Sequence, residues 1–357
     1  MMNDMKAKIL LRVVTAAGAA LTMTAPAGAA QGTQEFRLSG REVAVYNLAG
    51  EARIVRGQGS DVVVRVDTQG SDAAQLDIEV GRVNGAEALR ILYPSSPIVY
   101  PRLGRGSSST VRVSSDGTFS DGGGRGGDRV EVRGSGRGLE AYADLEIEVP
   151  AGRELALHLA VGTVDIRGVE GDFIIDTGSG PVTAQDIVGS VNIDTGSGHV
   201  AVLRVDGEVV VDTGSGRIEV ADVRGREINV DTGSGPVTGS NLTAARVRID
   251  TGSGRIELDQ VSSSEIHLDT GSGSVRVDLT EDVETLVVDT GSGSVTVSMP
   301  ETVGAELEVE TGSGGIDLEF PVQIRRASRD HVVGTIGDGR GTIRIDTGSG
   351  NVRLARQ

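Results

Sequence analysis

A pentapeptide, Asp-Thr-Gly-Ser-Gly, recurs along the second half of the chain and constrains the fold more than any other feature. Eight copies begin at Asp176, Asp194, Asp212, Asp231, Asp250, Asp269, Asp289 and Asp346, and one variant begins at Glu310. Successive copies start 18, 18, 19, 19, 19, 20, 21 and 36 residues apart. Such a period is typical of solenoids, in which each repeat contacts only its neighbours. Because the last interval is twice 18, we expect one degenerate coil within it.

Apolar residues alternate with polar ones on both sides of each pentapeptide. In the copy at Asp250, Val247 and Ile249 precede the motif, and Ile256 and Leu258 follow it. Alternation with a period of two indicates a β-strand with one buried face. Each repeat therefore predicts a strand, a Gly-Ser-Gly turn, a second strand and a looser return of about five residues.

These features predict an all-β fold, a parallel β-solenoid (β-helix) of about ten two-strand coils of 18–21 residues. One coil buries too few aliphatic side chains to offset the entropy of ordering it, so its backbone must hydrogen-bond to the coils above and below. A further coil is expected before the first motif, since Leu159–Asp165 lies 18 residues before Thr177–Thr183. We expect the aliphatic side chains of successive coils to share one core.

The first 30 residues predict an export signal. Lys6, Lys8 and Arg12 form a basic start, Val13–Thr24 is apolar, and Ala27–Ala29 offers small residues for cleavage. An apolar run of this length is too short to span a bilayer as a helix. The chain contains no cysteine, which excludes disulfides and thiol catalysis. We therefore expect an exported protein in the periplasm, at the cell surface or outside the cell.

Three further regions follow the signal. Residues 31–103 alternate in hydropathy and predict a small N-terminal β region that caps the solenoid. Residues 104–138 contain 11 Gly, 7 Ser and 6 Arg, which predicts a flexible loop. Residues 139–357 form the predicted solenoid. Arg353 and Arg356 on its final strand are expected to discourage end-to-end stacking.

The formal net charge of −17 restricts the partners of this chain. A strongly acidic surface repels nucleic acid and anionic lipid. Aromatic residues make up 2% of the chain, which is too few for a base-stacking surface. We expect a protein or cell-surface partner, no nucleic acid, and no integral membrane segment in the mature chain.

The run Phe173–Ser179, Phe-Ile-Ile-Asp-Thr-Gly-Ser, matches the catalytic motif of aspartic proteases. That chemistry needs two carboxylates facing each other across a closed cleft and sharing a proton. Equivalent acids side by side along a rod offer no such pair, so an aspartic-type hydrolase is disfavoured and we predict no catalytic residue. Instead, the motif predicts a turn. Both glycines would adopt positive φ, Asp would accept hydrogen bonds from the following amides, and Thr and Ser would pair with their counterparts in the next coil.

The stacked acids would repel each other by about 1 kcal/mol per neighbouring pair in water. They must therefore be solvated, hydrogen-bonded to turn amides or bridged by cations. No cofactor is predicted, and Ca²⁺ is a weak alternative because it favours several oxygen ligands. The weak metal candidates are Asp194, Asp212, Asp231, Asp250 and Asp269. The four histidines, His158, His199, His267 and His331, are predicted to be surface residues without metal-ligand spacing.

The repeated turns and the closing run Gly334–Gly350 resemble a bacterial "putative adhesin" family of unknown function, also called the toast-rack domain. The resemblance covers about residues 140–357 and, more loosely, 31–103. It implies a β-helical, envelope-located domain and supplies no catalytic residues. We predict a non-catalytic, adhesin-like scaffold for protein or surface interactions. The alternatives are an accessory module in envelope-stress signalling and a cation-binding structural β-roll.

Overall fold

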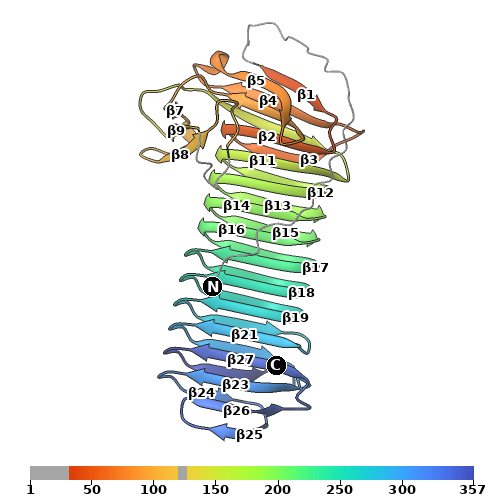
Figure 1. Ribbon diagram of the computed structural model, residues 1–357, viewed down its shortest axis with the longest axis vertical. Coiled ribbons are helices and arrows are strands. Elements are labelled where there is room, and N and C mark those ends of the chain that lie inside the picture. The colour runs from red at the N-terminus through yellow and green to blue at the C-terminus, as the bar shows by residue number, and fades with distance from the viewer. Residues whose placement is uncertain (1–31, 120–126) are drawn as a thin grey trace.

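The computed structural model describes residues 32–119 and 127–357, which form a long rod of β-strands (Figure 1). The predicted export signal lies outside these residues. Two short 3-10 helices, η1 (Ala73–Gln75) and η2 (Pro101–Leu103), interrupt the strands near the N-terminal end. Within the described ranges, no helix has both the length and the apolar character needed to cross a membrane.

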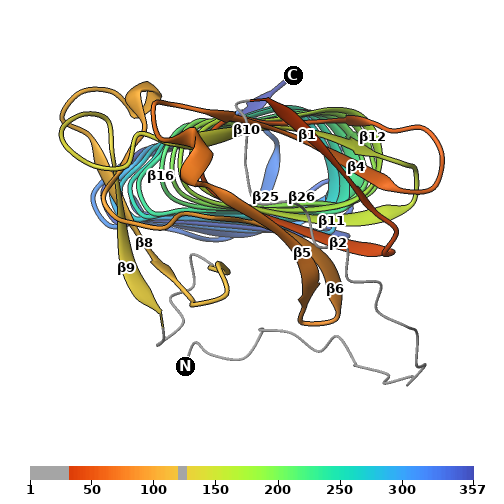
Figure 2. The same cartoon turned by 90° about the horizontal axis from the view of Figure 1, so that it is seen from above.

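Two parallel sheets face each other along the rod and give it a flattened cross-section (Figure 2). The first, here called the motif sheet, contains the segments that lead into each pentapeptide, and the second, the return sheet, contains the segments that follow it. The rod strands before residue 285 are β11 (Arg153–Val161), β12 (Val164–Ser179), β13 (Val182–Val188), β14 (Val191–Ser197), β15 (Val200–Asp206), β16 (Val209–Ser215), β17 (Ile218–Thr232), β18 (Val237–Thr251), β19 (Ile256–Thr270) and β20 (Val275–Leu279).

The rungs stack in strict register, as the sequence spacing requires. Val191 pairs with Val209 in the motif sheet, and Val200 pairs with Ile218 in the return sheet. These side chains point inward and are fully buried, together with their counterparts in every neighbouring rung. The prediction of an all-β fold with repeated parallel strands around one aliphatic core is confirmed.

In five successive rungs, from β13 to β19, the second corner is more regular than expected. One left-handed residue, with φ between 53° and 56°, bends the strand and leaves the ladder intact; these residues are Asp186, Arg204, Asp222, Asn241 and Gln260. As a result β17, β18 and β19 each run 15 residues from one sheet into the other. In these rungs the predicted loose return was wrong, because a single residue in the left-handed region can redirect a strand without breaking its pairing. In the two rungs that follow, the prediction of a return of about five residues is confirmed, since residues 280–284 separate β20 from the next motif-sheet strand and residues 300–304 lie at the equivalent place one rung later.

Antiparallel strands close the N-terminal end of the rod (Figure 1). The return sheet continues through β3 (Ala52–Arg56), β10 (Tyr142–Val149), β4 (Val62–Gln69) and β1 (Thr33–Leu38), and the motif sheet through β2 (Glu42–Ala49), β6 (Ala86–Leu92) and β5 (Asp77–Val83).

A small side sheet contains β7 (Ile98–Val99), β8 (Ser108–Val113) and β9 (Asp128–Arg133). The interpretation of 104–138 as a loop was therefore wrong in part, because β8 and β9 pair within it despite the Gly-rich composition.

The distal end departs from sequence order. Its strands are β21 (Thr285–Thr290), β22 (Val295–Met299), β23 (Ala305–Thr311), β24 (Ile316–Leu318), β25 (Val322–Ala327), β26 (His331–Ile336), β27 (Gly341–Thr347) and β28 (Val352–Arg356). The last rung, β27 and β28, inserts between β21–β22 and β23–β24.

The expected degenerate coil does not exist, because the long interval forms the antiparallel hairpin β25–β26 beyond β23. The expectation for Arg353 and Arg356 was also wrong, because β28 is an interior strand and not the end of the rod.

Candidate functional site

The pentapeptide corners form one continuous stack along the edge of the motif sheet. Each motif acid lies beside the acid of the next rung, from Asp176 to Asp289, then Asp346 and finally Glu310. The Asp-Thr segment belongs to the strand, so Asp points outward and Thr points inward. Alternation on a pleated strand thus gives the two neighbours opposite environments.

The buried threonine organises the corner. The Thr251 hydroxyl accepts a hydrogen bond from the Gly254 amide at 3.0 Å and donates one to the Gly235 carbonyl of the preceding rung at 3.2 Å. The same pair of bonds recurs at Thr270, Thr290, Thr347 and Thr311. The prediction that Asp would accept from the turn amides was wrong at these rungs, because Thr faces the amide.

The glycines are required mainly by close stacking. Both were expected at positive φ, but only the second glycine of the first three motifs has it, at Gly180, Gly198 and Gly216 with φ of 138°, 152° and 152°. In later rungs a Cβ at the second glycine would overlap the glycine carbonyl of the rung before it, as Gly254 would with Gly235. Glycine therefore permits neighbouring corners to approach.

The outward acids form a ladder on one flank. Burial, followed by repulsion from Asp250 and Asp212, raises the pKa of Asp231 above its ordinary value. Burial, followed by Asp250 and Asp289, raises the pKa of Asp269 in the same way. The weak metal candidates named from the sequence all lie in this ladder and point to the same side. Within residues 32–119 and 127–357, no three acid or histidine side chains converge as a metal site.

One acid of the ladder has a special partner that sequence analysis missed. The Asp176 carboxylate lies 3.0 Å from Nδ1 of His158, and both side chains are largely buried. The His158 ring stacks on Tyr46 with centroids 4.4 Å apart and an interplanar angle of 1°, and Phe119 meets both rings edge-on. Burial, followed by Asp116 and Asp176, raises the pKa of Tyr46. The 18-residue separation of His158 and Asp176 equals one rung and could have revealed the pair.

This cluster anchors the side sheet to the rod. Phe119 follows β8, and Tyr46, Ile98, Tyr100 and Val132 belong to the same buried apolar cluster. Burial raises the pKa of Tyr100 to about 12. Most of the few aromatic residues therefore fix the side sheet in place and are not available to bind a ligand.

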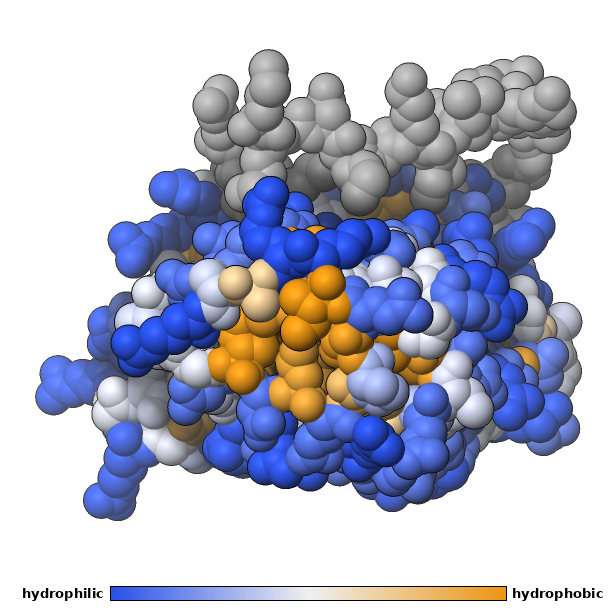
Figure 3. Space-filling view, turned by 90° about the horizontal axis from the view of Figure 1, so that it is seen from below, coloured by the Kyte–Doolittle hydropathy of each residue, from blue (hydrophilic) through white to orange (hydrophobic). Residues whose placement is uncertain are grey.

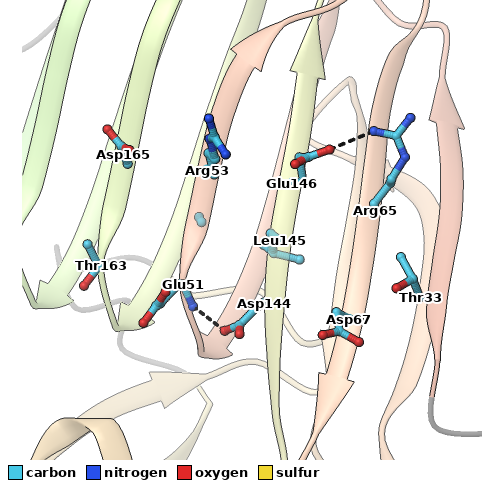
Figure 4. Close-up of a pocket in the computed structure, with 11 residues that line it drawn as sticks. Thr33, Glu51, Arg53, Arg65, Asp67, Asp144, Leu145, Glu146, Thr163 and Asp165 are labelled. Carbon is cyan, nitrogen blue, oxygen red and sulfur yellow. Dashed lines mark hydrogen bonds and ion pairs between the residues drawn. The ribbon is translucent and has the colours of Figure 1, made fainter.

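Two neighbouring hollows lie where the N-terminal cap, the side sheet and the rod meet. The larger, of about 460 Å³, opens over the return sheet, as Figure 4 shows. Its lining residues are Thr33, Glu51, Ala52, Arg53, Arg65, Asp67, Asp144, Leu145, Glu146, Thr163 and Asp165. The smaller, of about 340 Å³, lies between η2 and the glycine corners at Gly162, Gly180 and Gly198. Glu51 and Thr163 line both hollows, so the two form one depression.

The larger hollow carries charges of both signs in fixed positions. Arg65 pairs with Glu146 at 2.9 Å and with Glu148 at 2.5 Å. Arg102 pairs with Asp144 at 2.9 Å and with Glu51 at 3.1 Å. These bonds hold most of the acids in place and leave a rigid, charged floor, which suits recognition of a polar partner.

Arg53 is the exception on this floor. It lies between Glu146 and Asp165 in the return sheet. Glu146 is engaged by Arg65, and Asp165 by Arg167 at 2.6 Å. In the described part of the chain Arg53 makes no ion pair, and its side chain is exposed. Its guanidinium is therefore available to an incoming acidic group.

Fold and surface together define an all-β protein with a parallel, repeating rod. Residues 141–355 match the family Toastrack DUF4097, and the chain belongs to this family. No curated protein matches the chain.

Two crystal structures are similar to parts of this chain. One, a putative cell adhesion protein from Clostridium sporogenes ATCC 15579, has 10% identity and a TM-score of 0.20, with 91% of this chain and 99% of that chain covered. The other, a putative adhesin from Bacteroides fragilis NCTC 9343, has 13% identity and a TM-score of 0.30, with 90% and 95% covered.

Proposed function

We propose that this chain is a non-catalytic, exported cell-envelope protein that acts as an adhesin-like scaffold for protein or surface interactions. The rod holds its corners in register over many rungs, so surfaces at its two ends are held at a fixed separation. The depression at the N-terminal end is the recognition surface in this proposal. The observation that carries it is Arg53, an exposed cation without an ion pair, on a floor whose other charges apart from Asp67 are paired within the described chain.

The proposed partner presents an acidic group on a cell-envelope protein or surface polymer. Arg binds carboxylates through two parallel hydrogen bonds, which supplies orientation as well as attraction. The paired acids around Arg53 would disfavour partners that carry several negative charges close together.

Attachment of protein-coated beads to isolated cell envelopes tests this function. Beads carrying the exported protein should attach, and Arg53→Glu should abolish attachment by placing like charge opposite the acidic group. Arg217→Glu, the same charge change at an exposed corner of the rod, is the matched control and should attach as wild type. Equal attachment of wild type and Arg53→Glu would exclude this surface.

An aspartic-type hydrolase makes a different prediction. It requires peptide cleavage at acid pH that an Asp176→Asn/Asp194→Asn variant loses. We expect no such activity, because neighbouring ladder acids lie side by side in register and point to the same side, so they do not face each other. Cleavage that disappears in the variant would overturn the non-catalytic proposal.

A second proposal is weak cation binding along the acid ladder. It is favoured by the raised pKa of Asp231 and Asp269, since a cation would relieve the repulsion that contributes to both. A ligand that binds only the folded chain raises its Tm. Calcium should therefore raise the Tm more than sodium chloride of equal ionic strength does, and a chelator should reverse this increase. Equal Tm values in the two salts would show that calcium only screens the charges of the ladder and does not bind them.

A further inference from the structure

The two sheets of the rod end at different heights at the distal end. The motif sheet continues past β23 through β26 and β25. The return sheet stops at β24, which belongs to the same rung as β23 and pairs with β28. The end of the rod is therefore a step, in which β26 and β25 of one sheet have no counterparts in the other. Val332 and Ile336 of β26 are buried within the chain, whereas β25 is open.

The inner face of this protruding hairpin is apolar. Val322 pairs with Ile336, and Ile324 pairs with Gly334, which in turn lies beside the buried Leu307 of β23. Residues paired in this way share one face of the sheet, so Val322 and Ile324 continue the core face. Ile324 is 58% exposed, the largest value for any large apolar residue in the described chain.

Other core residues also emerge at this end. Ile316, Leu318 and Val322 pack against the main core but are only partly buried. Figure 3 shows an apolar area at this end of the rod surrounded by polar side chains. A contiguous apolar patch rimmed by polar residues is typical of an interaction surface.

Both sides of the step end in open strand edges. In the described chain, β24 pairs only with β28, and β25 pairs only with β26. Unpaired edges of this kind accept a further strand through backbone hydrogen bonds. The step thus offers a free edge and an apolar face at the same place.

Charges on the two edges are of opposite sign. Arg326 of β25 is on the outer face, since it pairs with Val333, and it makes no ion pair within the described residues. The outer residue of β24 is Asp317, whose side chain is 67% exposed and lies 3.8 Å from the Arg353 guanidinium of β28. An edge carrying a free cation and an edge carrying an exposed acid are complementary, and both belong to the same chain.

We propose that the distal step is a dimerisation surface for a second copy of this chain. A twofold axis across the rod end would place the hairpin of each copy on β24 of the other, so that β25 adds to the free edge of β24. The two hairpins would then face each other through Val322 and Ile324. This contact is isologous and closed, so it yields an end-to-end dimer and not a fibre.

Three observations single out a second copy as the occupant. The return sheet lacks the two strands that the motif sheet has in excess, so the shape of the step is its own complement. In the proposed dimer the apolar faces would meet each other, and Arg326 of one copy would lie near Asp317 of the other. A partner of different sequence would need to reproduce all three features independently. This inference does not depend on the proposed adhesive function.

Analytical ultracentrifugation of the exported protein tests the proposal. Wild type should sediment as a concentration-dependent dimer, and its maximum dimension in small-angle scattering should approach twice that of the monomer. Ile324→Glu should weaken dimerisation by about tenfold or more, because a charge would be buried at the centre of the interface. Val188→Glu is the matched control, since Val188 is 55% exposed on the rod flank, and it should dimerise as wild type.

A charge reversal gives an independent check. Arg326→Glu should weaken the dimer, because it would place like charge beside Asp317 of the other copy. A wild type that stays monomeric at all concentrations would overturn the proposal. A dimer that is insensitive to Ile324→Glu, or one whose scattering shows side-by-side rods, would overturn it as well. Melting curves of each variant separate loss of association from loss of folding.

Discussion

The Thr270 hydroxyl donates a hydrogen bond of 2.9 Å to the Gly254 carbonyl of the preceding rung. The same oxygen accepts a bond of 3.0 Å from the Gly273 amide of its own corner. Thr270 is fully buried, so neither backbone group has water as a substitute. One side chain therefore closes its own turn and ties it to the neighbouring rung, which makes Thr the structural centre of the pentapeptide.

Replacing this threonine by an isosteric apolar residue should be costly. Thr270→Val keeps the shape but leaves the Gly254 carbonyl and the Gly273 amide buried without partners. We expect a loss of about 1–3 kcal/mol in the free energy of unfolding, measured by urea denaturation. Thr270→Ser should retain most of the stability. Thr296→Val, at a partly exposed position of β22, is the control, and an equal effect there would contradict this role.

Glycine at the corner should be irreplaceable for steric reasons. A Cβ at Gly254 would overlap the Gly235 carbonyl, although Gly254 does not have positive φ. Gly254→Ala should lower the free energy of unfolding by about 3 kcal/mol, since the rungs would have to separate. At Gly315, the nearest atom to an added Cβ is 3.7 Å away, so Gly315→Ala should be close to neutral. Similar losses for both variants in urea denaturation would refute the stacking explanation.

Removing a charge from the acid ladder should stabilise the rod at neutral pH. Asp231 and Asp269 have folded-state pKa values above the ordinary 3.8, so the folded chain holds these protons more tightly. Their contribution to stability is complete below that value and is lost as the pH rises through the raised pKa. Asp231→Asn and Asp269→Asn should each add about 0.5 kcal/mol at pH 7, after solvent screening, and nothing near pH 3.

Urea denaturation at the two pH values checks this prediction. Asp282→Asn, an exposed acid outside the ladder, should change stability at neither pH. A gain that persists at acid pH would show that Asn helps through hydrogen bonding and not through lost repulsion.

The two proposals together imply bivalence. The depression around Arg53 lies at the N-terminal end, and Ile324 lies at the opposite end (Figure 1). An end-to-end dimer would carry one recognition surface at each extremity and could join two particles. Wild type should aggregate envelope-coated beads in a turbidity assay. Ile324→Glu should bind single beads without aggregating them. Aggregation by that variant would show that the joining of beads does not require the distal dimer.

The sequence predicted most of the rod because spacing and register are equivalent in a solenoid. With successive motifs 18 or 19 residues apart, Asp194 must lie beside Asp212, and the period-two pattern fixes which side chains point inward. The second corner was not predictable in the same way. Asp, Asn, Arg and Gln all occupy its left-handed position, so no shared residue type marks the column.

The identity of the turn acceptor was mistaken for a related reason. Asp and Thr are adjacent, and both can accept from turn amides. The period-two pattern that places Val247 and Ile249 inward also places Thr251 inward, provided that the strand continues into the corner, and the structure shows that it does. The hairpin β25–β26 was missed because a hydrophobic pattern indicates strands but does not give their order in space. No sequence pattern that we recognised between Glu310 and Asp346 indicates that the last rung returns to lie between two earlier ones.

That insertion makes the C-terminal rung a central element of the distal end. β27 contacts β21 on one side and β23 on the other, and β28 does the same with β22 and β24. A chain that ends at Arg340 would lack both strands and would separate the last hairpin from the rod. In hydrogen exchange, the amides of Ala305–Thr311 and His331–Ile336 should lose protection, while those of Val200–Asp206 should keep it. If the rungs instead followed sequence order, only the end of the truncated chain would fray and β23 would remain protected.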